Sequence, residues 1–248
     1  MFHPGDNVGT YALVRPLGRG AFGEVWLAER RSSILAAQVA LKLPVEAQAD
    51  ADIIRQQAKT WLQASGHPNI VPFLEADLHD GQIVIASEYV AGGSMADWLT
   101  ANGGKAPSLD EAVGMARGIL AGLDFLHRSH LIHRDLKPDN VLLQDGLPRL
   151  ADFGLTRALK SGKQTTNLTG TPGYMAPECL RGEYGIASDI WAAGAILYEM
   201  LCGTLPYPQK EFYALMLAMA GGEEPAALPE TIPEPIRNVV ARAVASQG

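Results

Sequence analysis

The sequence predicts an α+β fold, with a small β-rich part first and a larger helical part after it. Short apolar runs separated by glycines and turns continue as far as Val90, a pattern typical of strands. Beyond Gly92 and Gly93, apolar residues recur at helical spacing. With 248 residues, of which 47% are hydrophobic, the chain can bury a sizeable core. These observations exclude a disordered or disulfide-stapled chain.

The β-rich part is expected to contain one helix among its strands. Gly18, Gly20 and Gly23 lie between two apolar runs and predict a hairpin with a glycine turn. Apolar residues at helical spacing between Ala47 and Gly66 predict an amphipathic helix. The expected strands are Tyr11–Leu17, Glu24–Glu29, Val39–Leu43, Val71–Leu78 and Gln82–Val90, the last two joined by a turn at Asp80-Gly81.

The helical part begins with two capping signatures. Ser94 with Asp97, and Ser108 with Glu111, have the spacing at which a hydroxyl and a carboxylate satisfy the first amides of a helix. A continuous apolar stripe from Leu109 to Leu126 follows the second of them, and Asp145-Gly146 predicts a small hairpin. Later helices are expected at Asp189–Leu201, Glu211–Ala220 and Pro235–Ser246.

Charge and cysteine content argue against several classes of partner. The net charge of −7 provides no positive field for a nucleic-acid backbone, so no nucleic-acid partner is expected. Cys179 and Cys202 form no metal-binding pattern and are expected to be buried or idle thiols in a reducing compartment. The most apolar stretch, Ile190–Leu201, carries Glu199 and is shorter than the roughly 20 residues that span a membrane. We expect a cytoplasmic protein, or the cytosolic domain of a longer one, with no membrane segment in this chain.

The glycine-rich segment Gly18–Gly23 has the pattern GxGxxG, which is weak evidence on its own. It is compatible with a plain hairpin turn, or with a dinucleotide-dependent oxidoreductase, which needs a helix after the glycines. Here Val25–Ala28 continues as a strand, which argues against the oxidoreductase. Four further motifs follow in order: Val39–Lys42 (VALK), His133–Asn140 (HRDLKPDN), Asp152–Gly154 (DFG) and Ala176–Glu178 (APE).

Together the five motifs make the chain resemble a eukaryotic-type serine/threonine protein kinase domain, from about Tyr11 to the last residues. The resemblance implies a bilobal kinase fold with an N-lobe over residues 1–88, a hinge over 89–94 and a C-lobe over 95–248 that stops before the usual final helix. It also implies ATP and Mg²⁺ as cofactors and proteins as substrates. The alanine- and glycine-rich composition resembles bacterial members of the family.

The resemblance assigns roles to the motif residues. Asp135 would accept the proton of the substrate hydroxyl, and Lys42 would hold the α- and β-phosphates of ATP. Lys137 is typical of the serine/threonine branch, and Thr171 resembles the threonine that bonds to the catalytic Asp and Lys in that branch. Asn140 and Asp152 would bind Mg²⁺. The remaining residues expected around the nucleotide are Gly18, Gly20, Gly23, Val25, Ala40, Ser87, Glu88, Val90 and Leu142, with small Ser87 leaving a deep adenine pocket.

Two departures and one regulatory site accompany this resemblance. Gln57 occupies the position of the family glutamate that pairs with the lysine, so that the helix is expected to be held more weakly. The arginine that would pair with Glu178 is absent. Phosphate on Thr165 or Thr166 would find a partner in Arg134 and order the activation segment.

Other family residues are expected to be structural. Asp189 would hold the catalytic-loop backbone, and Trp61, Phe73, His133 and Phe153 would form a stacked apolar column. For Trp61 and Phe73, plain core packing is the alternative. The departures keep open an alternative, a weakly active kinase or pseudokinase that serves as a nucleotide-binding scaffold. The oligomeric state is left open.

Overall fold

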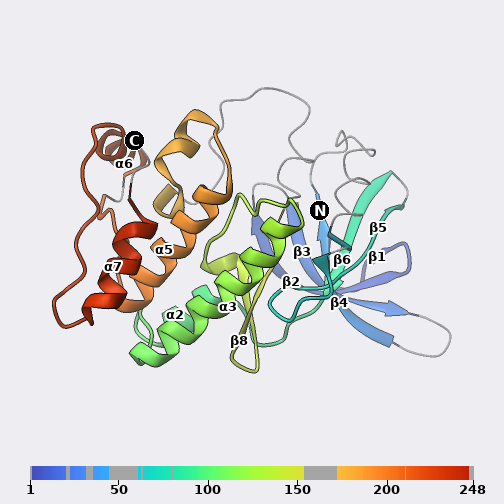
Figure 1. The fold of residues 1–248 in the computed structure, drawn as a ribbon. Coiled ribbons are helices and arrows are strands. Elements are labelled where there is room, and N and C mark those ends of the chain that lie inside the picture. Colours follow the sequence, from blue (N-terminus) through green and yellow to red (C-terminus); the bar gives the residue numbers. More distant parts are fainter. Residues whose placement is uncertain are drawn as a thin grey trace. The chain divides into compact units, whose positions relative to one another are not determined.

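The computed structural model describes residues 2–20, 23–31, 36–44, 61–62, 64–79, 81–153, 172–209 and 211–245 (Figure 1). These residues form two compact units, one from residues 2–91 and one from residues 92–153 and 172–245. The division falls inside the range expected for the hinge, 89–94, whose role as a hinge stays a prediction. A sheet in the first unit and helices in the second confirm the predicted α+β class.

The first unit is built on one antiparallel sheet with the order β1-β2-β3-β4-β6-β5. Its strands are β1 (Asn7–Val8), β2 (Tyr11–Gly20), β3 (Gly23–Arg31), β4 (Ala36–Leu43), β5 (Phe73–His79) and β6 (Gln82–Glu88). Five of them match the sequence prediction. Strand β1 was not predicted, because two residues are too few to show alternation.

The glycine-rich segment lies between antiparallel strands. Gly20 pairs with Gly23, and β3 begins at Gly23. A helix does not follow the glycines, so the dinucleotide-binding alternative is wrong.

One apolar cluster of this unit lies on one face of the sheet. Tyr11 and Leu41 are fully buried there, together with Val8, Leu13, Trp26, Ala28, Val39, Leu43, Val84 and Ala86. Because strand side chains alternate between faces, apolar residues two apart on neighbouring strands meet in this cluster.

The helix expected between Ala47 and Gly66 falls mostly outside the described residues. Trp61 is helical, 4% exposed, and its ring lies 5.2 Å from that of Phe73. Its indole N–H donates to the carbonyl of Val71 at 3.2 Å. This contact ties the end of the predicted helix to the start of β5.

The second unit is mainly helical. Its helices are α2 (Met95–Ala101), α3 (Leu109–Arg128), α5 (Ile186–Cys202), α6 (Phe212–Ala220) and α7 (Glu234–Ala243). Short 3-10 helices occur at η1 (Pro138–Asn140), η2 (Pro172–Tyr174) and η3 (Pro177–Arg181). Helix α5 packs against α3 and α7, so this mostly buried helix forms the centre of the unit.

The predicted helix starts and the second hairpin are observed. The Ser94 hydroxyl accepts from the Asp97 N–H at 3.1 Å and the Asp97 carboxylate accepts from the Ser94 N–H at 3.0 Å, which is the reciprocal capping box. Strands β7 (Val141–Gln144) and β8 (Leu147–Leu150) are joined by Asp145 and Gly146, whose φ angles are 52° and 79°. Positive φ at both turn residues is typical of a type I′ hairpin.

Cys179 is buried, as the sequence analysis expects. Cys179 and Cys202 are free thiols, and burial raises the pKa of Cys179 to about 11. Among the described residues, no helix has the combination of length and apolar character that crossing a membrane requires.

Candidate active site

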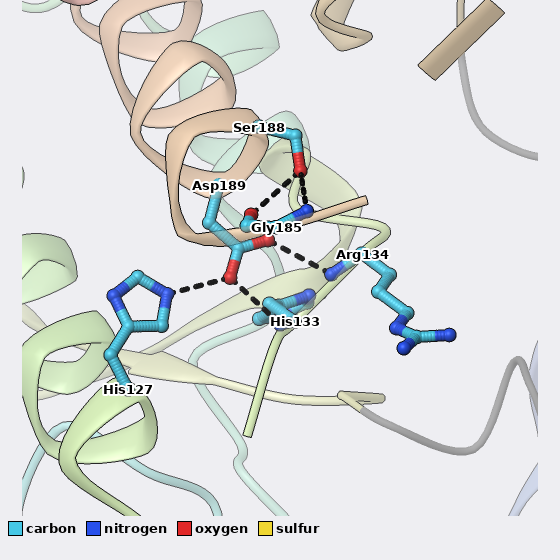
Figure 2. A network of polar contacts seen from close by, with 6 residues as sticks. All are labelled: His127, His133, Arg134, Gly185, Ser188 and Asp189. Carbon is cyan, nitrogen blue, oxygen red and sulfur yellow. Dashed lines mark hydrogen bonds and ion pairs between the residues drawn. The ribbon is translucent and has the colours of Figure 1, made fainter. Parts of the chain in front are cut away.

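The predicted catalytic loop, residues 133–140 and called the catalytic loop below, lies between α3 and β7 and is held by one buried carboxylate. Asp189, near the start of α5 and 1% exposed, accepts the N–H of His133 at 2.8 Å and the N–H of Arg134 at 2.9 Å. His127, from α3, lies 2.8 Å from the same carboxylate (Figure 2). A buried carboxylate needs such partners, and the partners here are two backbone amides of the loop and the His127 ring of α3.

The backbone of the loop is strained at the residue before Asp135. Arg134 has φ of 70°, which costs free energy for a residue other than glycine. The bond from its N–H to Asp189 holds this conformation. Ser188 fixes the start of α5, because its hydroxyl accepts from the Gly185 N–H at 2.9 Å and donates to the Gly185 carbonyl at 2.7 Å (Figure 2).

Asp135 is oriented by the side chain of Asn140. The amide nitrogen of Asn140 donates to the Asp135 carbonyl at 2.7 Å and to its Oδ2 at 3.1 Å. The Lys137 ammonium lies 4.0 Å from the same oxygen. The predicted residues Asp135, Lys137 and Asn140 therefore converge on one carboxylate.

Asp152 is brought beside Asn140 by the backbone. The N–H of Ala151 donates to the carbonyl of Asn140 at 2.9 Å, and Asp152 adopts a positive φ of 59°. Since Asn140 uses its amide nitrogen toward Asp135, its side-chain oxygen is the atom suited to a cation. No cluster of three or more His, Cys, Asp or Glu suited to a metal occurs in the described part of the chain. One amide and one carboxylate oxygen, completed by phosphate oxygens, fit the way proteins bind Mg²⁺.

His133, at the start of the catalytic loop, and Phe153, next to Asp152, are two buried rings in contact. Both are almost fully buried, and their rings lie 6.2 Å apart. Burial lowers the pKa of His133, against the opposing effect of Asp189 and two further carboxylates. The imidazole is therefore neutral and acts as an apolar ring, as the stacked column requires. The pairs His133–Phe153 and Trp61–Phe73 are each observed within their own unit.

A further carboxylate, that of Glu199, was not predicted from the sequence to belong to this region. The hydroxyl of Tyr174, in η2, donates to the carboxylate of Glu199, in α5, at 2.7 Å. Burial, more than the nearby Asp139, raises the pKa of Glu199. Tyr174, Met175 and Asp135 line one small cavity. An exposed helix position is the ordinary expectation for Glu199, and no local signal shows otherwise.

Most residues expected around the nucleotide lie on the sheet of the first unit. Lys42 on β4 pairs with Val25 on β3 and with Ile85 on β6. Ser87 on β6 pairs with Ala40 on β4. Three adjacent strands, β3, β4 and β6, therefore carry the four predicted residues Val25, Ala40, Lys42 and Ser87.

The hinge and glycine positions can be assigned more closely. The N–H of Glu88 donates to the Pro72 carbonyl at 3.0 Å, so that N–H does not serve a nucleotide. A Cβ at Gly23, which has φ of 136°, would lie 2.2 Å from the Leu43 carbonyl oxygen. A Cβ at Gly18 would have no heavy atom of another part of the chain within 4 Å. Gly23 is thus required by packing, whereas Gly18 has open space around it.

Some of the predicted site residues belong to different units or lie outside the described residues. Leu142 lies on β7 in the second unit, and Val90 is buried in the first. Gln57, Thr165, Thr166 and Thr171 lie outside the described residues, so their roles stay predictions. Glu178 is half-buried at the start of η3.

Comparison with known proteins matches residues 11–242 to the protein kinase domain. The chain is 34% identical to the carbon catabolite-derepressing protein kinase of Candida tropicalis, over 89% of this chain and 36% of that protein. It is 37% identical to the serine/threonine-protein kinase ATG1a of Arabidopsis thaliana, over 81% and 32%. The calcium-dependent protein kinase 12 of Oryza sativa subsp. japonica is 37% identical, over 79% and 38%.

The chain thus spans about a third of the length of these relatives. They come from a yeast and two plants, so the expected likeness to bacterial members receives no support from them. The family match covers most of the chain, and the named relatives include serine/threonine kinases, which confirms the resemblance drawn from the five motifs. The chain belongs to the protein kinase domain family.

Proposed function

We propose that this chain is an ATP-dependent protein kinase domain that transfers the γ-phosphoryl group to serine or threonine of protein substrates. The observation that carries the proposal is the orientation of Asp135 by Asn140, in a loop that the buried Asp189 carboxylate holds by two backbone amides. A carboxylate in a fixed position beside a cation is what proton abstraction in phosphoryl transfer needs.

In this reaction Asp135 accepts the proton of the attacking hydroxyl as the oxygen bonds to the γ-phosphorus and the bond to the β-γ bridging oxygen breaks. Lys137, 4.0 Å from Asp135, supplies positive charge next to the transferred group. Lys42 orients the phosphates from its strand. Asn140 and Asp152 are the residues that would hold Mg²⁺, which neutralises phosphate charge when bound.

The substrate hydroxyl is assigned to serine or threonine on the strength of Lys137 and the named relatives. The Thr171 hydroxyl would bond to Asp135 and Lys137 and stabilise their arrangement. Phosphorylation of Thr165 or Thr166 would activate the domain by placing negative charge near Arg134. Free thiols in both cysteines favour a cytoplasmic location.

The nucleotide site carries its own test. Small Ser87 at the rear of the adenine site predicts that ATP-site inhibitors with enlarged aromatic groups bind much better to the parent than to Ser87→Met. Equal affinities would show that Ser87 does not border the adenine site.

The central test compares two aspartates. Asp135→Asn should lower kcat at least 100-fold, within the range that general base catalysis contributes, with little change in thermal stability. Asp145→Asn is the matched control, because Asp145 is exposed in the β7–β8 turn and asparagine tolerates its positive φ. Transfer is measured with labelled ATP and a basic protein, followed by phosphoamino-acid analysis.

Parental activity in Asp135→Asn would contradict the kinase proposal. ATP binding by the parent without any transfer would instead favour the nucleotide-binding scaffold.

A further inference from the structure

Arg15 directly follows a β-bulge in strand β2. Leu13 pairs with Ala28 of strand β3. Arg15 pairs with the preceding residue of β3, Leu27, so Val14 has no partner on that strand. The described part of β2 is buried before the bulge and exposed from Val14 onward. Bulges recur beside active sites, where they turn a side chain to a new direction.

The bulge places Arg15 on the opposite face of the sheet from Leu13. With regular alternation, both residues would lie on the face that carries the apolar cluster of the first unit. One extra residue reverses that order. Leu27, the partner of Arg15, lies between Trp26 and Ala28, which both belong to the cluster. Leu27 and Arg15 therefore lie on the other face.

That other face carries the residues predicted around the nucleotide, and we call it the nucleotide face. Directly paired residues of antiparallel strands lie on the same face of a sheet. A first row across strands β2, β3, β4 and β6 is formed by Arg15, Leu27, Ala40 and Ser87. A second row, nearer the glycine turn, is formed by Gly18, Val25, Lys42 and Ile85. Arg15 thus shares a face with the predicted nucleotide residues.

A side-chain bond joins Arg15 to the residue that follows β6. The Nη2 of Arg15 donates to the hydroxyl of Tyr89 at 3.1 Å. Strands β3 and β4 lie between β2 and β6 in the sheet, which amounts to roughly 14 Å on a flat sheet. The bond therefore connects two strands that the sheet itself does not join, and it does so from the nucleotide face.

The row to which Arg15 belongs indicates which part of a nucleotide it borders. Lys42, predicted to hold phosphates, lies in the row next to the glycine turn. Ser87, predicted at the rear of the adenine site, lies in the row of Arg15. The two rows are separated by about 7 Å along β4. Arg15 is thus level with the base and not with the phosphates.

We propose that the bond between Arg15 and Tyr89 closes one edge of the nucleotide face and retains the nucleotide at its base and ribose end. While the bond is formed, β2 is restrained from moving away from the segment after β6, so the nucleotide leaves more slowly. The proposal rests on the proposed kinase function and makes Arg15 a further residue that determines nucleotide affinity.

The test uses three ligands that share the base but differ in the number of phosphates: adenosine, ADP and ATP. Arg15→Gln and Tyr89→Phe should each raise Kd about fivefold for all three in calorimetry. This change corresponds to about 1 kcal/mol, as for loss of one hydrogen bond. The dissociation rate constant should rise by a similar factor. Because the catalytic loop is untouched, kcat should stay at the parental level while KM for ATP rises.

A double variant and a matched control complete the experiment. Arg15→Gln/Tyr89→Phe should raise Kd no more than either single variant, because the two residues share one bond. Arg30→Gln is the control, since Arg30 lies on β3, pairs with Tyr11 of the apolar cluster and bonds to Glu75 at 3.0 Å. Loss of this arginine from the opposite face should leave all three Kd values unchanged.

Unchanged Kd values in both single variants would overturn the proposal. So would a loss confined to ADP and ATP, because Arg15 would then act on phosphate charge, and so would additive losses in the double variant. A parent chain that binds the three ligands but transfers no phosphate would contradict the kinase function, while the Kd comparison would still decide the role of Arg15. A parent that binds none of them would contradict both proposals.

Discussion

The catalytic loop and the glycine-rich turn both carry predicted site residues, yet they are held in different ways. In the catalytic loop, the carboxylate of Asp189 fixes two backbone amides of residues 133 and 134. In the described residues, the glycine turn is held by strand pairing, which extends to Gly20 and Gly23, and by the close approach of Gly23 to Leu43.

The difference follows from what each segment has to do. A catalytic carboxylate needs a fixed position, and a buried charge with several donors resists displacement because each donor would be left unsatisfied. A turn that covers phosphates needs a backbone free of side chains, and it needs room. Gly18 has that room, whereas Gly23 marks where the turn joins the packed sheet.

The largest effect is expected from removal of the buried Asp189 carboxylate. Asp189→Ala should lower the free energy of unfolding by about 3–5 kcal/mol, as for removal of one partner from a buried ionic cluster. It should also lower kcat at least tenfold, because Arg134 is no longer held at positive φ. Thermal unfolding and transfer kinetics measure the two effects.

Asp124→Ala is the control for Asp189→Ala. Asp124 pairs with Arg128 at 3.0 Å but is 58% exposed, and surface pairs contribute less than about 1 kcal/mol. If both variants lose the same stability, the catalytic loop does not depend on a buried charge.

The glycine turn should respond to one alanine and tolerate another. Gly23→Ala should cost about 2–3 kcal/mol, because its Cβ would meet the Leu43 carbonyl oxygen at 2.2 Å and its φ is 136°. Gly18→Ala should change stability by less than about 0.5 kcal/mol. Urea unfolding of the two variants side by side gives the comparison, and equal losses would show that Gly23 is not special.

The neutral His133 should make stability depend on pH. Burial lowers its pKa in the folded state, so below pH about 6.5 the unfolded chain binds a proton that the folded chain does not. The contribution of neutral His133 to the free energy of unfolding is complete above that pH. It is lost as the pH falls, by at most about 1.4 kcal/mol per pH unit. Urea unfolding between pH 7.5 and 5.5 should show a smaller loss in His133→Phe than in the parent. Identical slopes would mean that other groups account for the acid sensitivity.

The smallest effect is expected at the start of α5. Ser188→Ala removes the hydroxyl that caps Gly185 and should cost about 1 kcal/mol. Since Asp189 keeps its own bonds to the loop, kcat should stay within about twofold of the parent. A large loss of kcat with the small loss of stability would show that the cap, and not the carboxylate alone, positions the loop.

Local patterns predicted most of the fold. Alternation, glycine turns and capping residues predicted five strands of the first unit, the α2 cap and the β7–β8 turn, because each depends on residues close together in the chain. Motif order predicted Asp135, Asn140 and Asp152 as site residues. The helix around Gln57 and the threonines of the activation segment stay predictions, since they lie outside the described residues.

By itself, therefore, the sequence determined the family and most of the described elements, and it predicted which residues carry the chemistry, since spacing along the chain encodes all of these. Only the tertiary structure decided that His127 faces Asp189, that Tyr174 bonds to Glu199 and that Gly23 is required by Leu43. It also decided that Arg15 bonds to Tyr89. Each of these depends on residues far apart in sequence or on burial against a neighbouring element, and no local pattern contains that information.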